Sequence, residues 1–283
     1  GLAIVALFWS AFVVRLLRMI AASRAPDRLH LLVIAGACAI GALAFWIAAW
    51  GLAAGAPARL ALAESVLLHG FLAPVFVAAL HRMVPFVHVA SQTIERRFGN
   101  APLALPIGAF LLQPIVQAIA GATGDASIAR ALHTIAFVVD AAAAALLAWI
   151  ALRWRMQQNL RIRLLAMLFG ALAWLGIAFA LQAADAFALA SGFPATGLRL
   201  AALHALAMGF FASTMLAMVS RVTCGQAGRM LSSETIVWWL FLALQAAVVL
   251  RLIAAALPAQ SMLVWSLRYA GWYGRPRTEA RAR

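Results

Sequence analysis

Residues 204–229 read HALAMGFFASTMLAMVSRVTCGQAGR, and this stretch decides the fold class. A histidine opens an apolar run that approaches the length of about 20 residues needed to cross a bilayer. At 100° per residue, several side chains fall on one line of the predicted helix. They are His204, Met208, Phe211, Met215 and Met218. We therefore expect a buried helix with an imidazole and thioethers on one face, which suits haem or a soft metal or serves packing alone.

The composition extends this interpretation to the whole chain. Of its 283 residues, 66% are hydrophobic and the mean hydropathy is +0.98, more apolar surface than a soluble protein of this size could cover. We predict an all-α fold, a polytopic transmembrane helix bundle forming a single domain over residues 1–283. Because Gly1 lies within an apolar run, we expect the chain to be truncated or processed at its N-terminus. We also expect a short cytoplasmic tail over about 274–283.

About nine segments are predicted to cross the membrane, and the connections between them are too short to form a soluble domain. The predicted spans are 2–22, 30–52, 60–83, 102–121, 128–152, 162–188, 199–221, 235–257 and the shorter 259–273.

The basic residues give the orientation. All 22 are arginines, and 18 of them lie in segments on one side of the predicted membrane. The other four are Arg59, Arg130, Arg199 and Arg251. By the positive-inside rule the arginine-rich side is cytoplasmic, so the chain begins outside and ends inside, which requires the ninth crossing. The net charge of +14 therefore indicates contact with lipid head groups and not with nucleic acid.

Ionisable side chains within a span are costly and are candidates for function. Helical rise places a layer of polar residues in the outer half of the membrane. This layer comprises Glu64, His69, His133, Gln182, Asp185 and His204, with Asp140 deeper. Three histidines on three helices suit the axial ligands of a cofactor. Hydrogen bonding between helices is the simpler alternative for each of them.

A second polar cluster occupies residues 81–88 on the arginine-rich side. Arg82 lies at the predicted membrane boundary, where its guanidinium can reach a lipid phosphate or a cofactor propionate. Arg221 begins a similar basic turn after the seventh span. We expect His81 and His88 to be solvated.

Three segments carry a family resemblance. His204-Ala-Leu is followed at residues 218–229 by MVSRVTCGQAGR, and residues 82–86 read RMVPF. A weaker similarity covers 164–181. Together these segments, within about 64–257, resemble the NnrS family of bacterial membrane proteins. The resemblance implies a haem- and copper-containing protein of the bacterial inner membrane, linked to nitric oxide, denitrification and protection from nitrosative stress.

The chain also departs from the family pattern. Gln226 stands where the family usually has histidine, and the region of Leu168 lacks another family histidine. The family's N-terminal Trp-His-x-His-Glu segment has no counterpart. His204 is the main family histidine that remains. The chain also contains no Cys-x-x-Cys-His motif, which excludes covalent haem attachment within it.

Our leading hypothesis is a haem-binding, copper-capable membrane protein that responds to nitric oxide or a related small molecule. His204 would be one axial ligand, with His69 or His133 opposite, and Arg82 or Arg221 would neutralise propionates. The residues assigned to the cofactor are His204, His69, His133, Met208, Arg82 and Arg221, and those assigned to copper are His204 and Met215.

Two alternatives remain open. In the first, the protein is a transporter or permease, with Asp140, Asp185 and His133 lining a polar path. In the second, it is a membrane partner protein that holds no cofactor. The sequence predicts no catalytic residue and no oligomeric state.

Overall fold

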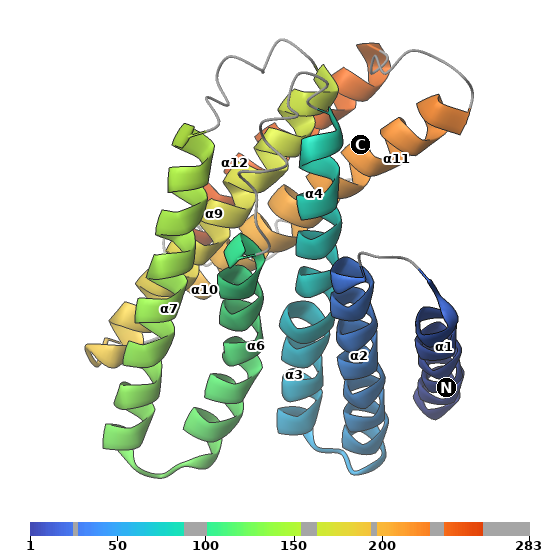
Figure 1. Ribbon diagram of the computed structural model, residues 1–283. Helices are drawn as coiled ribbons and strands as arrows, with labels where there is room; N and C mark the ends of the chain where they lie inside the picture. Colours follow the sequence, from blue (N-terminus) through green and yellow to red (C-terminus); the bar gives the residue numbers. More distant parts are fainter. Residues whose placement is uncertain (25–27, 88–100, 154–162, 194–196, 227–234, 257–283) are drawn as a thin grey trace, which may run out of the picture.

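The computed structural model describes residues 1–24, 28–87, 101–153, 163–193, 197–226 and 235–256. Within these ranges every element is helical, and eight helices are long and apolar enough to cross a membrane (Figure 1). The prediction of an all-α, polytopic transmembrane bundle is therefore confirmed. The ninth predicted span, 259–273, and the tail after it lie outside the described residues.

Two of the eight spans are interrupted by π-helical segments. The span Pro57–Arg82 consists of α3 (Pro57–Ser65), the π-helical η1 (Val66–Leu72) and most of α4 (Ala73–Val87). The span Leu198–Cys224 consists of α10 (Leu198–His204), the π-helical η2 (Ala205–Ala212) and most of α11 (Ser213–Gln226). The other spans are α1 (Leu2–Ala22), α2 (Leu29–Ala53), α6 (Ala101–Ala122), α7 (Ala126–Arg153), α9 (Arg163–Ala190) and α12 (Thr235–Ala256).

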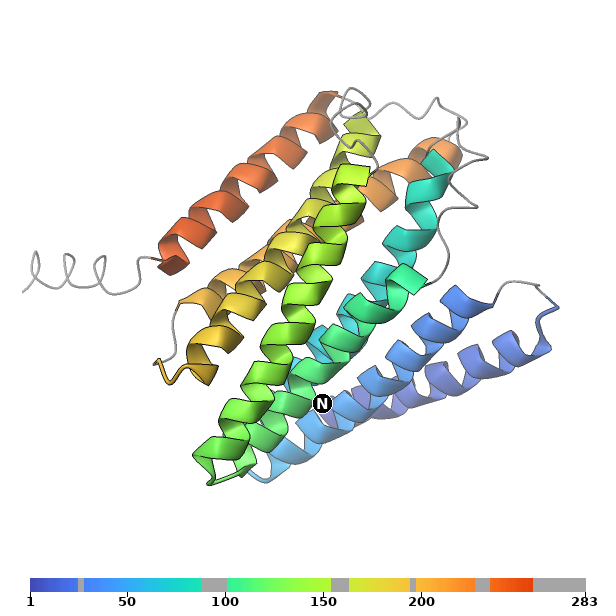
Figure 2. The ribbon, with the colours of Figure 1, turned by 60° about the vertical axis from the view of Figure 1, so that its left-hand side comes forward.

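The helix α9 forms the centre of the bundle. In its most apolar window 61% of the residues are buried, against 17% for α1 and 11% for α12. Figure 2 shows α1 and α12 at opposite margins, where most of their side chains are left to face lipid. Aromatic contacts stabilise part of the core, since the rings of Phe110 on α6 and Phe179 on α9 lie 4.5 Å apart in a tilted arrangement. The apolar stretches of the outer helices are thus largely exposed at the surface of the bundle, as expected in a membrane.

The two ends of the bundle differ in charge. The helices α3, α7 and α10 begin at the same end of the bundle, which we call the arginine-poor end; each has one arginine near its start, namely Arg59, Arg130 and Arg199. Tight connections join α2 to α3 and α6 to α7 at this end, and Figure 1 shows both at the bottom of the view. The opposite end, where α1, α4, α7 and α11 finish, is the arginine-rich end.

The η2 segment changes which residues share a face. A π-helical turn holds one residue more than an α-helical turn, so the side chains beyond it are displaced by about 100°. Met215, three residues after η2, is consequently 49% exposed. The prediction that His204 and the methionines share one buried face is therefore wrong for Met215.

Candidate functional site

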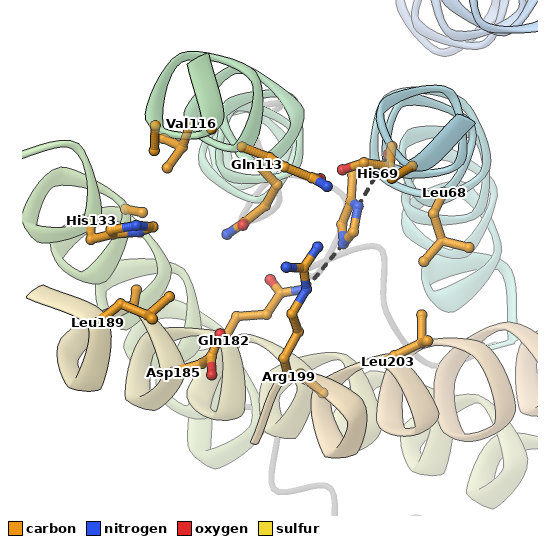
Figure 3. A pocket seen from close by; sticks show the side chains of 18 of the residues that line it. Leu68, His69, Gln113, Val116, His133, Gln182, Asp185, Leu189, Arg199 and Leu203 are labelled. Atoms are coloured by element: carbon orange, nitrogen blue, oxygen red, sulfur yellow. Dashed lines mark hydrogen bonds between the residues drawn. The ribbon is translucent and has the colours of Figure 1, made fainter. Parts of the chain in front are cut away.

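A polar cavity of about 670 Å³ opens at the arginine-poor end, between the α3–η1 helix, α6, α7, α9 and α10 (Figure 3). Side chains from five helices converge there, which only the folded bundle can bring together. Its polar lining residues are Glu64, Ser65, His69, Gln113, Gln117, His133, Gln182, Asp185 and Arg199. The remaining lining is mainly alanine and leucine. The cavity is large enough for a ligand the size of a drug or cofactor.

His69 projects from η1 into this cavity. Its Nδ1 lies 3.1 Å from the backbone oxygen of Ser65, and its Nε2 lies 3.4 Å from Nε2 of Gln182. A carbonyl can only accept and an amide nitrogen can only donate, so the ring carries its proton on Nδ1. Its Nε2 is consequently the acceptor, and Figure 3 shows this nitrogen directed toward Gln182 at the cavity.

The other side of the cavity carries His133 and the end of α9. Figure 3 shows His133 on α7 across the space from His69, and Asp185 one turn beyond Gln182. Arg199 on α10 points its guanidinium toward Gln182 and His69. The site thus offers two imidazoles, acids and one guanidinium, a set that can hold a ligand of mixed polarity.

Asp140 lies behind the cavity wall. Its side chain is fully buried, and its Oδ2 accepts a hydrogen bond of 2.6 Å from Nε2 of Gln113, which does line the cavity. Its Oδ1 has no hydrogen-bond partner among the described residues. Asp140 therefore does not line the cavity itself, but it is hydrogen-bonded to the side-chain amide of Gln113, which does.

The structure brings His69 and His133 to one cavity but leaves His204 outside its lining. The neighbours Ala202 and Leu203 do line the cavity, whereas the half-buried His204 follows them as the last residue of α10. Met208 packs against the hydrophobic core. The histidine and thioether predicted as cofactor ligands are thus not gathered at the polar cavity.

Arg82 and Arg221 lie at the arginine-rich end. Arg82 is 13 residues beyond His69 on a continuous helix, which is about 20 Å along its axis. Arg221 is 17 residues beyond His204, or about 25 Å. Neither guanidinium can therefore neutralise a carboxylate in the polar cavity, and Arg199 occupies the position that the prediction required.

His81 corrects a further expectation. Its Nδ1 lies 3.0 Å from Nε2 of His30, and the two rings stack at 5.2 Å with an interplanar angle of 30°. His30 is 8% exposed. The prediction that His81 is solvated is therefore wrong, because α2 covers this part of α4. His88, the other member of that prediction, lies outside the described residues.

Arg199, Gln113 and Gln117 line the cavity but were not predicted as site residues from the sequence. Arg199 carried a usable signal, since it is one of four arginines on the side that the positive-inside rule leaves poor in them. Gln113 and Gln117 are spaced at i and i+4 within an apolar span, which places both amides on one face of α6. Uncharged amides attract less notice than charges, although burying them is also costly.

Comparison with known proteins identifies the family. The family model described as NnrS protein matches residues 1–275. This chain belongs to the NnrS family. The match covers nearly the whole NnrS-family chain and extends beyond the 64–257 region that carried the resemblance. Neither the curated proteins nor the solved structures gave a match to it.

The donor set of this NnrS-family chain limits the metals that it can hold. Within the described ranges, no three or more side chains of His, Cys, Asp or Glu lie close enough together to ligate one ion. A site built only from such side chains, as structural zinc requires, is thus not present in this part of the chain.

Proposed function

We propose that this NnrS-family protein binds haem in the polar cavity through His69 and acts in the response to nitric oxide. The observation that carries the proposal is the hydrogen bond of His69 Nδ1 to the Ser65 carbonyl. Histidines that ligate metals usually donate their second ring N–H in this way, which fixes the tautomer and the ring orientation. The Nε2 atom then binds a cofactor once the long contact to Gln182 is displaced and the Arg199 guanidinium moves aside.

The rest of the cavity suits the same group. His133 lies across the space from His69 and would supply a second imidazole to hold the haem, while Arg199 would pair with a propionate. Bound haem iron would supply the nitric oxide chemistry. The protein's own residues would orient the cofactor, and the apolar part of the lining would limit access of water.

Copper fits less well at the residues first assigned to it. Met215 is 49% exposed beyond η2, so it cannot share an enclosed site with His204. We therefore do not propose a copper site at His204 and Met215.

We place the protein in the bacterial inner membrane, with the polar cavity on the outer side. The arginine distribution supports this orientation, because the cavity opens at the end that holds few arginines. A cysteine introduced at Asp125, between α6 and α7, should react with an impermeant thiol reagent added to intact spheroplasts. Labelling of this cysteine only after lysis would show that the cavity faces the cytoplasm and that the proposed orientation is wrong.

An optical spectrum tests haem binding. The purified chain, titrated with haem in detergent, should develop a Soret band with the sharp features of axial histidine ligation. His69→Ala should weaken binding at least tenfold. His204→Ala is the matched comparison, because it tests the ligand that the sequence alone favoured.

The outcomes separate the alternatives. A Soret band lost in His204→Ala and retained in His69→Ala would transfer the ligand role to His204. No saturable Soret band in the wild-type protein would refute the proposal and favour a protein without a cofactor.

A second candidate function is transport along a polar path. It is favoured by the hydrogen bond from cavity-lining Gln113 to the buried Asp140, which continues the polar character of the cavity into the membrane. Intramembrane acids commonly mark proton relays. Proton-coupled flux in liposomes that disappears in Asp140→Asn would support transport, and haem binding without such flux would exclude it.

A further inference from the structure

Two more imidazoles meet at the opposite end of the bundle. His30 lies in the first turn of α2, and His81 lies near the end of α4. Their facing nitrogens, Nε2 of His30 and Nδ1 of His81, are 3.0 Å apart. Neither residue lines the polar cavity. The pair therefore has a geometry and a location that the proposed haem site does not explain.

The pair is separate from the haem site. His81 follows His69 by 12 residues on the continuous helix of α3, η1 and α4, a distance of about 18 Å along the axis. A ligand in the polar cavity cannot contact both ends. Any binding at His30 and His81 is thus independent of the proposed function.

We propose that His30 and His81 together bind one divalent first-row transition-metal ion. Imidazole nitrogens favour this class of ion, and histidines bind it at about 2.0–2.1 Å. Two ligands of a tetrahedral ion at that bond length are about 3.3 Å apart. The observed 3.0 Å is close to this spacing, so the site forms when the rings separate slightly and turn until both facing nitrogens point at the ion. Water completes the coordination, since the pair supplies two ligands.

Binding requires one tautomer change. In the hydrogen-bonded pair, one ring donates its N–H to the lone pair of the other. When the metal enters, the donor ring moves that proton to its second nitrogen, and both facing nitrogens then coordinate. No proton is released from two neutral rings. If the pair holds an extra proton, the metal displaces it, so binding weakens as the pH falls.

The location allows metal entry. Both histidines lie within a few residues of the arginine-rich end, where the spans of α2 and α4 meet the aqueous boundary. Arg82 follows His81 directly, but successive helical residues point about 100° apart, and Arg82 is exposed. Its charge weakens attraction of a cation without occupying the same helix face.

Cobalt(II) is the probe for the experiment. The full chain is purified without a polyhistidine tag and titrated with Co(II) in detergent, with visible d–d absorption and equilibrium dialysis as readouts. We expect one equivalent to bind. His30→Ala and His81→Ala should each lower the affinity at least tenfold, whereas His204→Ala, which lies outside both sites, should leave it unchanged.

Stability measurements exclude a purely structural pair. Because a ligand that binds only the folded state raises its stability, Co(II) should raise the unfolding temperature of wild type and not that of either alanine variant. Absence of Co(II) binding in wild type, or wild-type affinity for Co(II) in either His30→Ala or His81→Ala, would overturn the proposal. Haem titration of the same samples shows whether the cavity site is intact, so failure at one site is distinguishable from failure at the other.

Discussion

Replacement of Gly209 by alanine tests how tightly η2 packs against Trp174 of α9, next to Met208. Gly209 lies in η2, and an added Cβ would meet Trp174 at 2.6 Å from Cγ and 2.7 Å from Cδ2. Contacts this short force a side chain or a helix to move. Overpacking of this kind typically costs about 1–3 kcal/mol.

The Trp174 ring has little freedom to move. Only 9% of it is exposed, and its indole N–H donates to the side-chain oxygen of Gln245 on α12. Gln245 in turn donates a hydrogen bond of 3.0 Å to Oγ of Ser213 on α11. Displacing the ring would weaken this chain, at about 0.5–1.5 kcal/mol for each hydrogen bond. We therefore expect Gly209→Ala to destabilise the protein by about 2–4 kcal/mol.

Gly176→Ala is the matched control on α9. Its added Cβ would meet the Leu147 Cβ at 3.7 Å, an ordinary contact, so the variant should match wild type or gain up to about 1 kcal/mol. Unfolding by sodium dodecyl sulfate in mixed micelles, followed by circular dichroism, gives both values. Equal stability of the two variants would show that Trp174 yields freely, and the reasoning would be refuted.

Three further perturbations test other contacts. Gln113→Leu removes the donor to the buried Asp140 and should cost about 1–3 kcal/mol in the same unfolding assay, whereas Gln113→Glu with Asp140→Asn should restore part of it. Arg59→Ala removes a guanidinium 3.7 Å from the centre of a tryptophan ring and should cost about 0.5–1 kcal/mol, with Arg59→Lys intermediate. Hydrogen bonds from Ser127 lower the pKa of the Asp125 carboxyl in the folded protein. The ionised carboxyl therefore stabilises the fold above its unfolded-state pKa of about 4, and this stabilisation is lost as the pH falls through the lowered folded-state pKa. Amide protection in the first turn of α7 should therefore decrease below about pH 4 in wild type, but should already be low at neutral pH in Asp125→Ala.

The helix boundaries could be predicted closely because the bilayer fixes them. The first predicted span, 2–22, coincides with α1, and the fifth, 128–152, lies within two residues of α7 at each end. Apolar length and punctuating loops are properties of the sequence alone. The rotation of each helix about its own axis could not be predicted, because a helix surrounded by lipid needs no polar face and its sequence therefore does not show which side is buried.

Depth was also predictable, whereas lateral position was not. Helical rise placed His69, His133 and Asp185 in one layer, and the structure brings all three to the polar cavity. The same calculation placed His204 in that layer, yet its side chain does not line the cavity. Residue counting gives height along the membrane normal, but the choice among neighbours at one height depends on which helices pack together.

The π-helical segment η1 explains why His69 in particular presents a lone pair to the cavity. In a continuous α-helix the carbonyl of residue 65 would accept the backbone N–H of residue 69. Over Val66–Leu72 the π-helical pattern instead joins each amide to the carbonyl five residues before it. The Ser65 carbonyl then lies within 3.1 Å of the His69 ring, which is held with Nδ1 toward the backbone and Nε2 outward. The π-helical turn thus supplies a backbone carbonyl that fixes the imidazole tautomer, so no other side chain is needed as the acceptor. A variant that restored a regular α-helix here should therefore weaken haem binding without changing any cavity residue.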